Sequence, residues 1–421
     1  MKAVLILVLL AAAAGSYFAV RWYIGNTLAE YFNPAQNNMR VAEMAVEFAP
    51  SDPLAHWRMA QVSQKLLPLD QQSHAVAEYE RAVMLSPNDY RFWMALGTAH
   101  EQTGDRVKGE QALRRAVALA PSYSYPHWYL GNLLLRSGRY DEAFKELRLA
   151  AEADLELEPQ QFNFLWAIYS DNLEALKKAL GGNSETRARF ALYLVNQQRH
   201  DDGLRVWDSL SGDEKKANRQ IADSIVAKLV IERRYHDAMR VWNDIAVNER
   251  YRAELGKVFD GSFEDAINYG PDMVFGWQVK NAPQLQIGID PTKSNGGNRS
   301  LRVVFQVRAK LESLNIAQLI PVDPNSEYDL EYYFMTEKFE TGSAPMVQIF
   351  DGTDGALLAS SAQAPSGSNP WNRVNLSFKT AGKTEAVQIR IVRVNCSDEE
   401  ALICPIFGSI WYDDFSLKRR R

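Results

Sequence analysis

The stretch from Pro87 to Pro121 decides the fold of the first half of this 421-residue chain; it reads PNDYRFWMALGTAHEQTGDRVKGEQALRRAVALAP. Two segments of helical period flank Gly104, which stands where a helix would end and a turn begin. Small residues at Gly97 and Ala116 let two antiparallel helices approach closely, while large residues such as Trp93 fill the space around them. Because each proline ends one hairpin and begins the next, the stretch predicts a repeating helical hairpin with a period of 34 residues.

The same spacing recurs on both sides of this stretch. The following unit keeps Leu130, Gly131 and Ala143 at the equivalent positions, and the preceding unit keeps Ala82. These units resemble the tetratricopeptide repeat, with His100 where that repeat usually has tyrosine. The resemblance implies stacked hairpins with a concave surface that takes an extended peptide or a partner helix.

A weaker echo extends the predicted array towards the middle of the chain. Residues 199–207 and 234–242 share the order arginine, aspartate, valine, tryptophan, and they lie 35 residues apart. We therefore expect an α-solenoid of tetratricopeptide-like hairpins over residues 34–256, with a degenerate middle.

Three tryptophans follow the repeat prolines, and we align Trp57, Trp93 and Trp128 as equivalent positions. The side chains expected on the inner helices, towards a partner, are Met94, Thr98, Glu101, Trp128, Asn132 and Leu135. The alternative for Trp128 and Leu135 is that they fill the core of the array.

The hydrophobic pattern changes near Phe259. Apolar and polar residues alternate over residues 301–307, 328–334, 374–378 and 387–391, and segments rich in Gly, Asn, Asp, Ser and Pro separate these runs. Alternation with a period of two predicts strands that bury one face. Several short strands at this spacing indicate an antiparallel β-sandwich of the jelly-roll kind over residues 259–418.

The ends of this sandwich segment carry a second resemblance. The segment opens with DGSFE at residues 260–264 and closes with WYDDF at residues 411–415. This bracket looks like the carbohydrate-binding jelly rolls that accompany cellulases and xylanases. The resemblance implies the jelly-roll fold and raises two ligand hypotheses.

The first hypothesis is a structural calcium ion. In the resembled modules, acidic residues near the first strand and in the last strand converge on a hard cation. Carried over to this chain, the ligands would be Glu264 and Asp413 or Asp414, since calcium prefers carboxylate and carbonyl oxygens. The alternative is that Glu264 caps a turn and the aspartate pair is solvated.

The second hypothesis is glycan binding. Sugar rings stack on exposed aromatic side chains that polar groups flank. The predicted carbohydrate-binding residues are Trp277, Trp371, Tyr269 and Tyr412, with Phe275 and Tyr333 as further aromatic candidates. The alternative for Trp277 and Trp371 is packing in the core or at a sheet edge.

The N-terminus predicts a membrane segment over residues 1–23. Residues 3–20 carry no charge, Lys2 precedes them, and Arg21 closes the run with two aromatic residues. A cleaved secretory signal begins in the same way, and residues 11–16 are small enough for cleavage. We favour an uncleaved anchor because the apolar run continues past those residues. Both interpretations place the bulk of the chain outside the cytoplasm. If the segment is an anchor, it crosses a bacterial-type inner membrane once and the rest of the chain lies in the periplasm.

The chain has two cysteines, Cys396 and Cys404. In an oxidising compartment they are expected to form a disulfide, and the alternative is a pair of reduced thiols. A zinc site is disfavoured because no histidine lies near them in the sequence.

The sequence argues against chemistry and against nucleic acid. Its formal net charge is -5 and it shows no basic stripe. It contains no glycine-rich phosphate loop and no nucleophile elbow, and its paired aspartates are adjacent rather than opposed across a substrate. We therefore predict a non-catalytic scaffold whose only cofactor is the hypothetical calcium.

The predicted scaffold is anchored in the membrane, recruits a protein through the repeats and binds a glycan through the jelly roll. Assembly or export of an extracellular polysaccharide would suit such a protein. The alternative is a purely protein-binding assembly factor whose sandwich no longer binds sugar.

Overall fold

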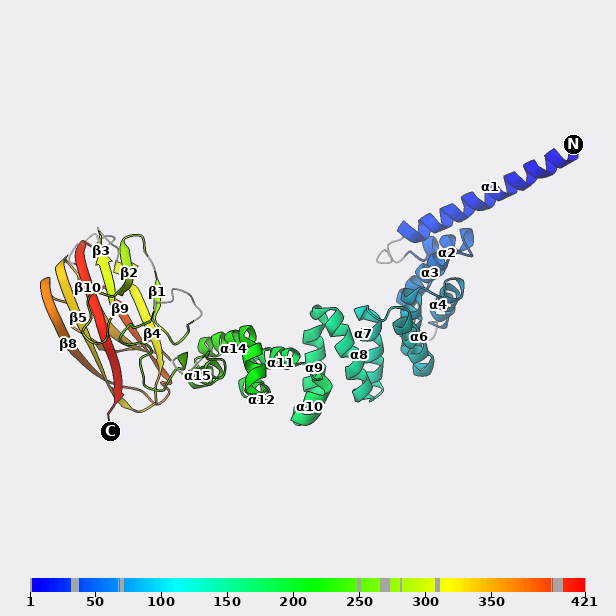
Figure 1. Ribbon diagram of the computed structural model, residues 1–421. Helices are drawn as coiled ribbons and strands as arrows, with labels where there is room; N and C mark the ends of the chain where they lie inside the picture. The colour runs from blue at the N-terminus through cyan, green and yellow to red at the C-terminus, as the bar shows by residue number, and fades with distance from the viewer. Residues whose placement is uncertain are drawn as a thin grey trace. The chain divides into compact units, whose positions relative to one another are not determined.

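The computed structural model describes residues 2–31, 38–66, 68, 72–247, 251–265, 273–280, 282–306, 311–394, 396 and 404–420. Helices α1 to α15 precede strands β1 to β10 (Figure 1), so the predicted order of a helical array followed by an antiparallel β-sandwich is confirmed. The chain divides into two compact units, Met1–Gly182 and Asn183–Arg421. The second unit holds both the last helical hairpins and the sandwich.

The first unit is built from helices that pair with their neighbours along the chain. Its helices are α1 (Lys2–Tyr31), α2 (Met39–Phe48), α3 (Pro53–Leu66), α4 (Ser73–Leu85), α5 (Tyr90–Gln102), α6 (Arg106–Leu119), α7 (Ser124–Arg136), α8 (Tyr140–Ala153), α9 (Glu158–Tyr169) and α10 (Leu173–Leu180). The tightest pairs are α3 with α4, α5 with α6, and α7 with α8, as the repeat predicts.

Glycines set how closely the paired helices approach. A Cβ atom added to Gly97 would lie 2.6 Å from Cγ of Leu113, and one added to Gly131 would lie 2.7 Å from Cγ of Leu147. Neither position has room for a larger side chain without movement of its neighbour. Gly104, which joins α5 to α6, has φ +90°, a conformation that other residues rarely adopt. The predicted close packing and the predicted turn are thus confirmed.

The repeat prolines reveal an alignment that differs from the predicted one. A ring nitrogen of the sixth residue after each proline lies 2.9 Å from the carbonyl oxygen of that proline: His56 with Pro50, Trp93 with Pro87 and His127 with Pro121. Trp93 is therefore equivalent to His56 and His127, and not to Trp57 and Trp128, which come one residue later. The alignment of the three tryptophans was therefore wrong. It matched residue type, whereas the equivalent position holds histidine in two units and tryptophan in one, and both rings offer a nitrogen for the same contact.

Helix α1 has two different halves. Residues Val4–Val20 are exposed, and Val4–Tyr31 is, among the described residues, the one helix long and apolar enough to cross a membrane. The second half packs on the first hairpin: Ala29 is buried, and its carbonyl oxygen accepts a hydrogen bond from Arg58 at 3.1 Å. Gly25 lies directly against Ala49. The exposed apolar half of α1 thus continues without a break into the half that packs on α2 and α3.

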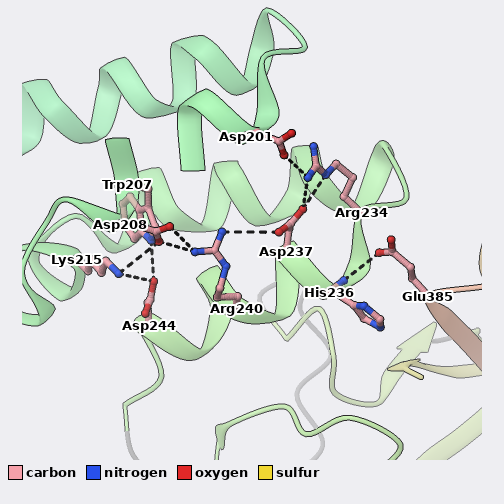
Figure 2. A network of polar contacts seen from close by, with 10 residues as sticks. All are labelled: Asp201, Trp207, Asp208, Lys215, Arg234, His236, Asp237, Arg240, Asp244 and Glu385. Atoms are coloured by element: carbon pink, nitrogen blue, oxygen red, sulfur yellow. Dashed lines mark hydrogen bonds and ion pairs between the residues drawn. The ribbon is translucent and has the colours of Figure 1, made fainter. Parts of the chain in front are cut away.

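The helices of the second unit repeat a charged pattern. They are α11 (Ser184–Asn196), α12 (His200–Asp208), α13 (Gly212–Ala217), α14 (Arg219–Ile231) and α15 (Tyr235–Asp244). Figure 2 shows ion pairs that join α12 to α15: Arg240, in the middle of α15, reaches Asp208 at 2.6 Å, and Arg234, just before α15, reaches Asp201 at 2.5 Å. Arg234 and Arg240, which follow Arg199 and Arg205 by 35 residues, therefore join successive hairpins.

The sandwich consists of two five-stranded antiparallel sheets. The first sheet has the order β1-β4-β9-β6-β7 and the second sheet has the order β2-β3-β10-β5-β8. The strands are β1 (Gln278–Lys280), β2 (Leu285–Asp290), β3 (Ser300–Phe305), β4 (Asn315–Pro321), β5 (Glu327–Thr341), β6 (Met346–Asp351), β7 (Leu357–Ser360), β8 (Gly367–Lys379), β9 (Ala386–Val392) and β10 (Ile406–Arg419). Alternate residues such as Leu301, Val303 and Ile389 are buried between the sheets, as the period of two predicts.

Helix α15 packs on one end of the first sheet. The Tyr235 hydroxyl donates a hydrogen bond to the Gly352 carbonyl oxygen at 2.5 Å, and a ring nitrogen of His236 lies 2.9 Å from the Val322 carbonyl oxygen. The His236 backbone N–H donates to Glu385 at 3.3 Å (Figure 2). These three partners follow β6, follow β4 and precede β9, so the last hairpin closes the end of the sandwich.

The two cysteines form a disulfide, Cys396–Cys404, with the Cα atoms 5.9 Å apart. Beside it, the buried guanidinium of Arg393 donates to the carbonyl oxygens of Ser343 at 3.0 Å and of Cys404 at 3.3 Å. Burial lowers the pKa of Arg393 to about 10. The predicted disulfide is present. The hydrogen bonds of Arg393 connect the chain on both sides of it to the segment around Ser343.

Candidate binding surfaces

The first candidate surface is a groove between the inner helices α5 and α7. It has a volume of about 520 Å³. Thr98 and Glu101 line it from α5, and Trp128 and Asn132 line it from α7. These are four of the six residues predicted to face a partner.

The other two predicted residues, Met94 and Leu135, pack against a buried cluster that includes Leu113 and Leu130. Core packing was the stated alternative for Leu135. Trp128 serves both purposes, because its half-buried ring stacks on Phe164 at 6.0 Å and still lines the groove.

Hydrogen bonds fix the polar side chains of the groove. Arg136 donates to both carboxylate oxygens of Glu101, at 2.6 and 2.7 Å. The Asn132 amide donates to the Trp128 carbonyl oxygen at 2.8 Å, which leaves its own amide oxygen as an acceptor. The groove is therefore largely preformed, which lowers the entropic cost of binding.

The groove carries an excess of positive charge. Arg106, at the start of α6, and Arg136 both line it, whereas Glu101 is the one carboxylate among its described lining residues. The side chain of Arg106 has no hydrogen-bond or ion-pair partner among the described residues. The side-chain amide oxygen of Gln102 accepts a hydrogen bond from the Gln64 side chain at 2.5 Å, so the side-chain N–H groups of Gln102 remain as donors.

The predicted sugar-stacking residues do not gather on one face. Trp277 and Tyr412 are 5% and 2% exposed and belong to the core of the sandwich, where their faces are covered. Trp277 packs 5.0 Å from the Phe415 ring, and its indole N–H donates to the Asp260 carbonyl oxygen. Neither ring offers a face to a sugar, and for Trp277 core packing was the stated alternative.

The remaining aromatic candidates are dispersed. Trp371 lies half-buried on β8, at the edge of the second sheet, and Tyr333 lies half-buried on β5. Phe275 is buried, with its ring 6.1 Å from that of Trp242 on α15. Tyr269 lies outside the described residues.

The second candidate surface is the outer face of the first sheet. Gln388 and Arg390 on β9 alternate with core residues and so point outwards beside Phe350 and Gln348 of β6, their cross-strand partners. The Arg390 guanidinium lies 4.5 Å from the centre of the Phe350 ring and donates to the Gln388 amide oxygen at 2.7 Å. Sequence reasoning missed this cluster, because only the strand order brings β6 beside β9.

The predicted calcium ligands surround one loop, residues 294–299. Asp413 is 0% exposed, and both of its carboxylate oxygens accept hydrogen bonds from backbone N–H groups. Oδ2 accepts from Asn295 at 2.7 Å and from Gly296 at 3.2 Å, and Oδ1 accepts from Asp414. Burial raises the pKa of Asp413 to about 6. Glu264 Oε1 accepts the N–H of Asn298 at 2.7 Å.

Asp414 accepts from the Asn295 side chain at 2.7 Å, so the loop meets all three predicted ligands. The described residues contain no group of three or more His, Cys, Asp or Glu side chains arranged to hold a metal ion. Asp413 and Glu264 accept hydrogen bonds from the loop backbone, and Asp414 accepts one from the Asn295 side chain. Calcium at this place stays a prediction.

Comparison with known proteins supports the helical assignment. A tetratricopeptide repeat model matches residues 73–124 and 108–155. The E3 ubiquitin-protein ligase CHIP of Arabidopsis thaliana is 31% identical over 78 residues, which are 18% of this chain and 28% of that protein. The chain thus spans little more than a quarter of this curated relative. Residues 73–155 carry tetratricopeptide repeats, the class of scaffold that the sequence predicts.

Solved structures overlap with parts of the chain. A CBM4 carbohydrate-binding module is 11% identical, covers 39% of this chain and 99% of its own, with a TM-score of 0.30. The MamA protein is 12% identical, and the match covers 52% of this chain and 96% of MamA, with a TM-score of 0.30. A structure of the CBM22-1 and GH10 modules of a Clostridium thermocellum xylanase is 14% identical. The match covers 39% of this chain and 29% of the xylanase chain, with a TM-score of 0.26.

Proposed function

We propose that this chain is a non-catalytic, membrane-anchored scaffold whose repeats recruit a protein partner. The observation that carries the proposal is the preformed groove of about 520 Å³ between α5 and α7. Stacked helical hairpins present such grooves to peptides and helices of other proteins. A half-buried tryptophan beside an arginine is also the residue composition of interface hot spots.

The anchor in this proposal is the first half of α1. Its side chains from Val4 to Val20 are apolar or small and exposed, so water would surround them unless a bilayer covers them. With Lys2 on the cytoplasmic side, the rest of the chain lies outside the cytoplasm, in a bacterial-type periplasm. The disulfide is consistent with an oxidising compartment there.

A photo-crosslinking amino acid at Tyr129, in the groove, tests the recruitment of a partner. The matched control carries the same amino acid at Val107, which is 69% exposed on α6 and outside the groove lining. The proposal expects one protein to be captured from Tyr129, in cells that make the chain, and not from Val107. Capture of the same proteins from both positions, or of none, would contradict it.

A second candidate function, glycan binding by the sandwich, is favoured by the outer face of the first sheet. Phe350 supplies a ring and Gln348, Gln388 and Arg390 supply amide and guanidinium groups around it, which is the chemistry that sugars need. Assembly or export of a surface polysaccharide is the setting that we propose for it.

Glycan binding is tested by titrating the full chain, in detergent, with a panel of soluble glycans. Phe350→Ala should weaken saturable binding at least tenfold, about 1.4 kcal/mol. Phe407→Ala, which removes a ring that is 44% exposed on β10 of the other sheet, is the matched aromatic control and should leave that affinity unchanged. If the folded chain binds no glycan, the purely protein-binding alternative replaces this function.

We also propose structural calcium at Glu264, Asp413 and Asp414. The support is that all three carboxylates meet the same loop and that Asp413 is buried without a cationic side chain among its hydrogen-bond partners in the described residues. Calcium should raise the melting temperature of the wild-type chain. Asp413→Asn should abolish that rise, and Asp354→Asn, in a different loop, should keep it. If calcium leaves the melting temperature of the wild-type chain unchanged, the chain has no structural calcium site here.

A further inference from the structure

An aromatic segment of the chain adjoins the groove, whose lining includes Tyr129. Tyr125, Tyr129, Asn132 and Arg136 follow one another on α7 at helical spacings of four, three and four residues, so they form one stripe along that helix. Tyr125 and Tyr129 are 54% and 36% exposed. Just before α7, the exposed ring of Tyr123 lies 5.2 Å from the Tyr90 ring. Exposed tyrosines that gather in this way provide large contact areas at low entropic cost.

The opposite end of the stripe is charged. Arg136 is paired with Glu101, and Arg106 adds a second guanidinium to the same lining. The sum of these three charges is one positive charge. An acidic side chain of a partner would therefore be attracted to this end, while a basic one would be repelled.

The middle of the groove suits an extended chain. Asn132 retains a free amide oxygen, and Gln102 retains amide N–H groups, so together they can accept from and donate to a peptide backbone. A helical partner has already used its backbone groups internally, whereas an extended one has them free.

The length of the stripe sets the spacing of the partner's anchors. Arg136 follows Tyr125 by eleven residues and Tyr129 by seven. At about 1.5 Å per helical residue, these intervals are roughly 16 Å and 10 Å. An extended chain advances about 3.3 Å per residue, so it covers these distances in about five and three residues.

We propose that the groove binds an extended peptide segment in which an aspartate or glutamate lies three to five residues from an aromatic residue. The acidic side chain lies at Arg106 and Arg136, and the aromatic ring lies among Tyr125 and Tyr129. This inference rests on the proposed recruiting function and adds the chemistry and register of the partner segment.

The test is a selection of random peptides on the full chain in lipid nanodiscs. Asn132→Tyr serves as the counter-selection, because it fills the groove at a side chain that, among the described residues, bonds only to its own helix. Enrichment of peptides with an acidic and an aromatic residue at this spacing is the expected result. Fluorescence anisotropy of one such peptide should then show at least a tenfold loss for Arg106→Glu. Arg115→Glu, an exposed arginine further along α6, should show no loss.

Each other outcome overturns a defined part of the account. Enrichment of basic or purely apolar peptides that Asn132→Tyr rejects would disprove the acidic-aromatic register and leave recruitment intact. Affinity that is equal for spacings of one, four and nine residues would disprove the register alone. Absence of any peptide that distinguishes the wild-type chain from Asn132→Tyr would disprove both the inference and recruitment through this groove.

Discussion

Arg136 on α7 holds Glu101 on α5 through two parallel hydrogen bonds of 2.6 and 2.7 Å, which join two successive repeats across the groove. Half of the Arg136 side chain remains exposed. Because solvent screens such a pair, its contribution to stability is small, about 0.2–1 kcal/mol. Its larger effect is on the charge that the groove presents to a partner.

Glu101→Gln should therefore strengthen the binding of an acidic peptide. The substitution removes the competing carboxylate from Arg136, and we expect an affinity gain of about twofold to fivefold, equivalent to at most about 1 kcal/mol. Anisotropy titrations of the wild-type and Glu101→Gln chains measure it. Weaker binding of the acidic peptide to Glu101→Gln would show that the carboxylate itself takes part in recognition.

Close packing within the hairpins should make Gly131 intolerant of side chains. Gly131→Ala places a Cβ 2.7 Å from Leu147 and is expected to cost about 1–3 kcal/mol in the free energy of unfolding. Gly182→Ala, where no atom lies within 4 Å, is the control and should change it by less than about 0.5 kcal/mol. Urea unfolding followed by circular dichroism distinguishes the two; equal stabilities would mean that the hairpins are looser than described.

The contact between α15 and the first sheet should stabilise the sandwich. Tyr235→Phe removes the hydrogen bond to the Gly352 carbonyl oxygen and is expected to cost about 0.5–1.5 kcal/mol. Tyr129→Phe, on an exposed ring, is the matched control. A scan by differential calorimetry measures both variants. An unchanged melting profile for Tyr235→Phe would show that α15 does not support the sandwich.

His56 should make the first unit less stable as the pH rises. Burial opposes its charge, but hydrogen bonds to Glu78 and to the Pro50 carbonyl, with the attraction of Glu78, raise its pKa above 6.5. A raised pKa in the folded state means that the stabilisation is complete below pH 6.5, the pKa of the unfolded state, and is lost as the pH passes through the folded pKa.

The stability difference between wild type and His56→Gln should consequently shrink from about pH 6 to pH 8. Urea unfolding at constant ionic strength, repeated across this range, measures the difference. A difference that stays constant or grows with pH would contradict the charged pair of His56 with Glu78.

The helical fold could be read from the sequence because its determinants are local. Gly97 and Gly131 mark the close helix contacts, and their spacing from the repeat prolines fixes the hairpins. The shared hydrogen bond of His56 and Trp93 to a proline carbonyl was not readable, since it depends on ring geometry and not on residue type.

The sandwich faces were less accessible from the sequence. An aromatic side chain such as Trp277 or Trp371 suits both a core and a binding face, and only the packed strands distinguish these two environments. Phe350 and Arg390 are 40 residues apart, and they meet because β6 pairs with β9. Their juxtaposition therefore requires the strand order, which alternation alone does not supply.

The central claim is that the groove between α5 and α7 recruits a protein. Its most direct test is the affinity of the partner captured at Tyr129 for the full chain in nanodiscs, compared with that for Asn132→Tyr. The account predicts that filling the groove weakens binding at least tenfold, about 1.4 kcal/mol or more, while Arg115→Glu leaves it unchanged. Equal affinity of the partner for wild type and Asn132→Tyr would contradict recruitment through this groove.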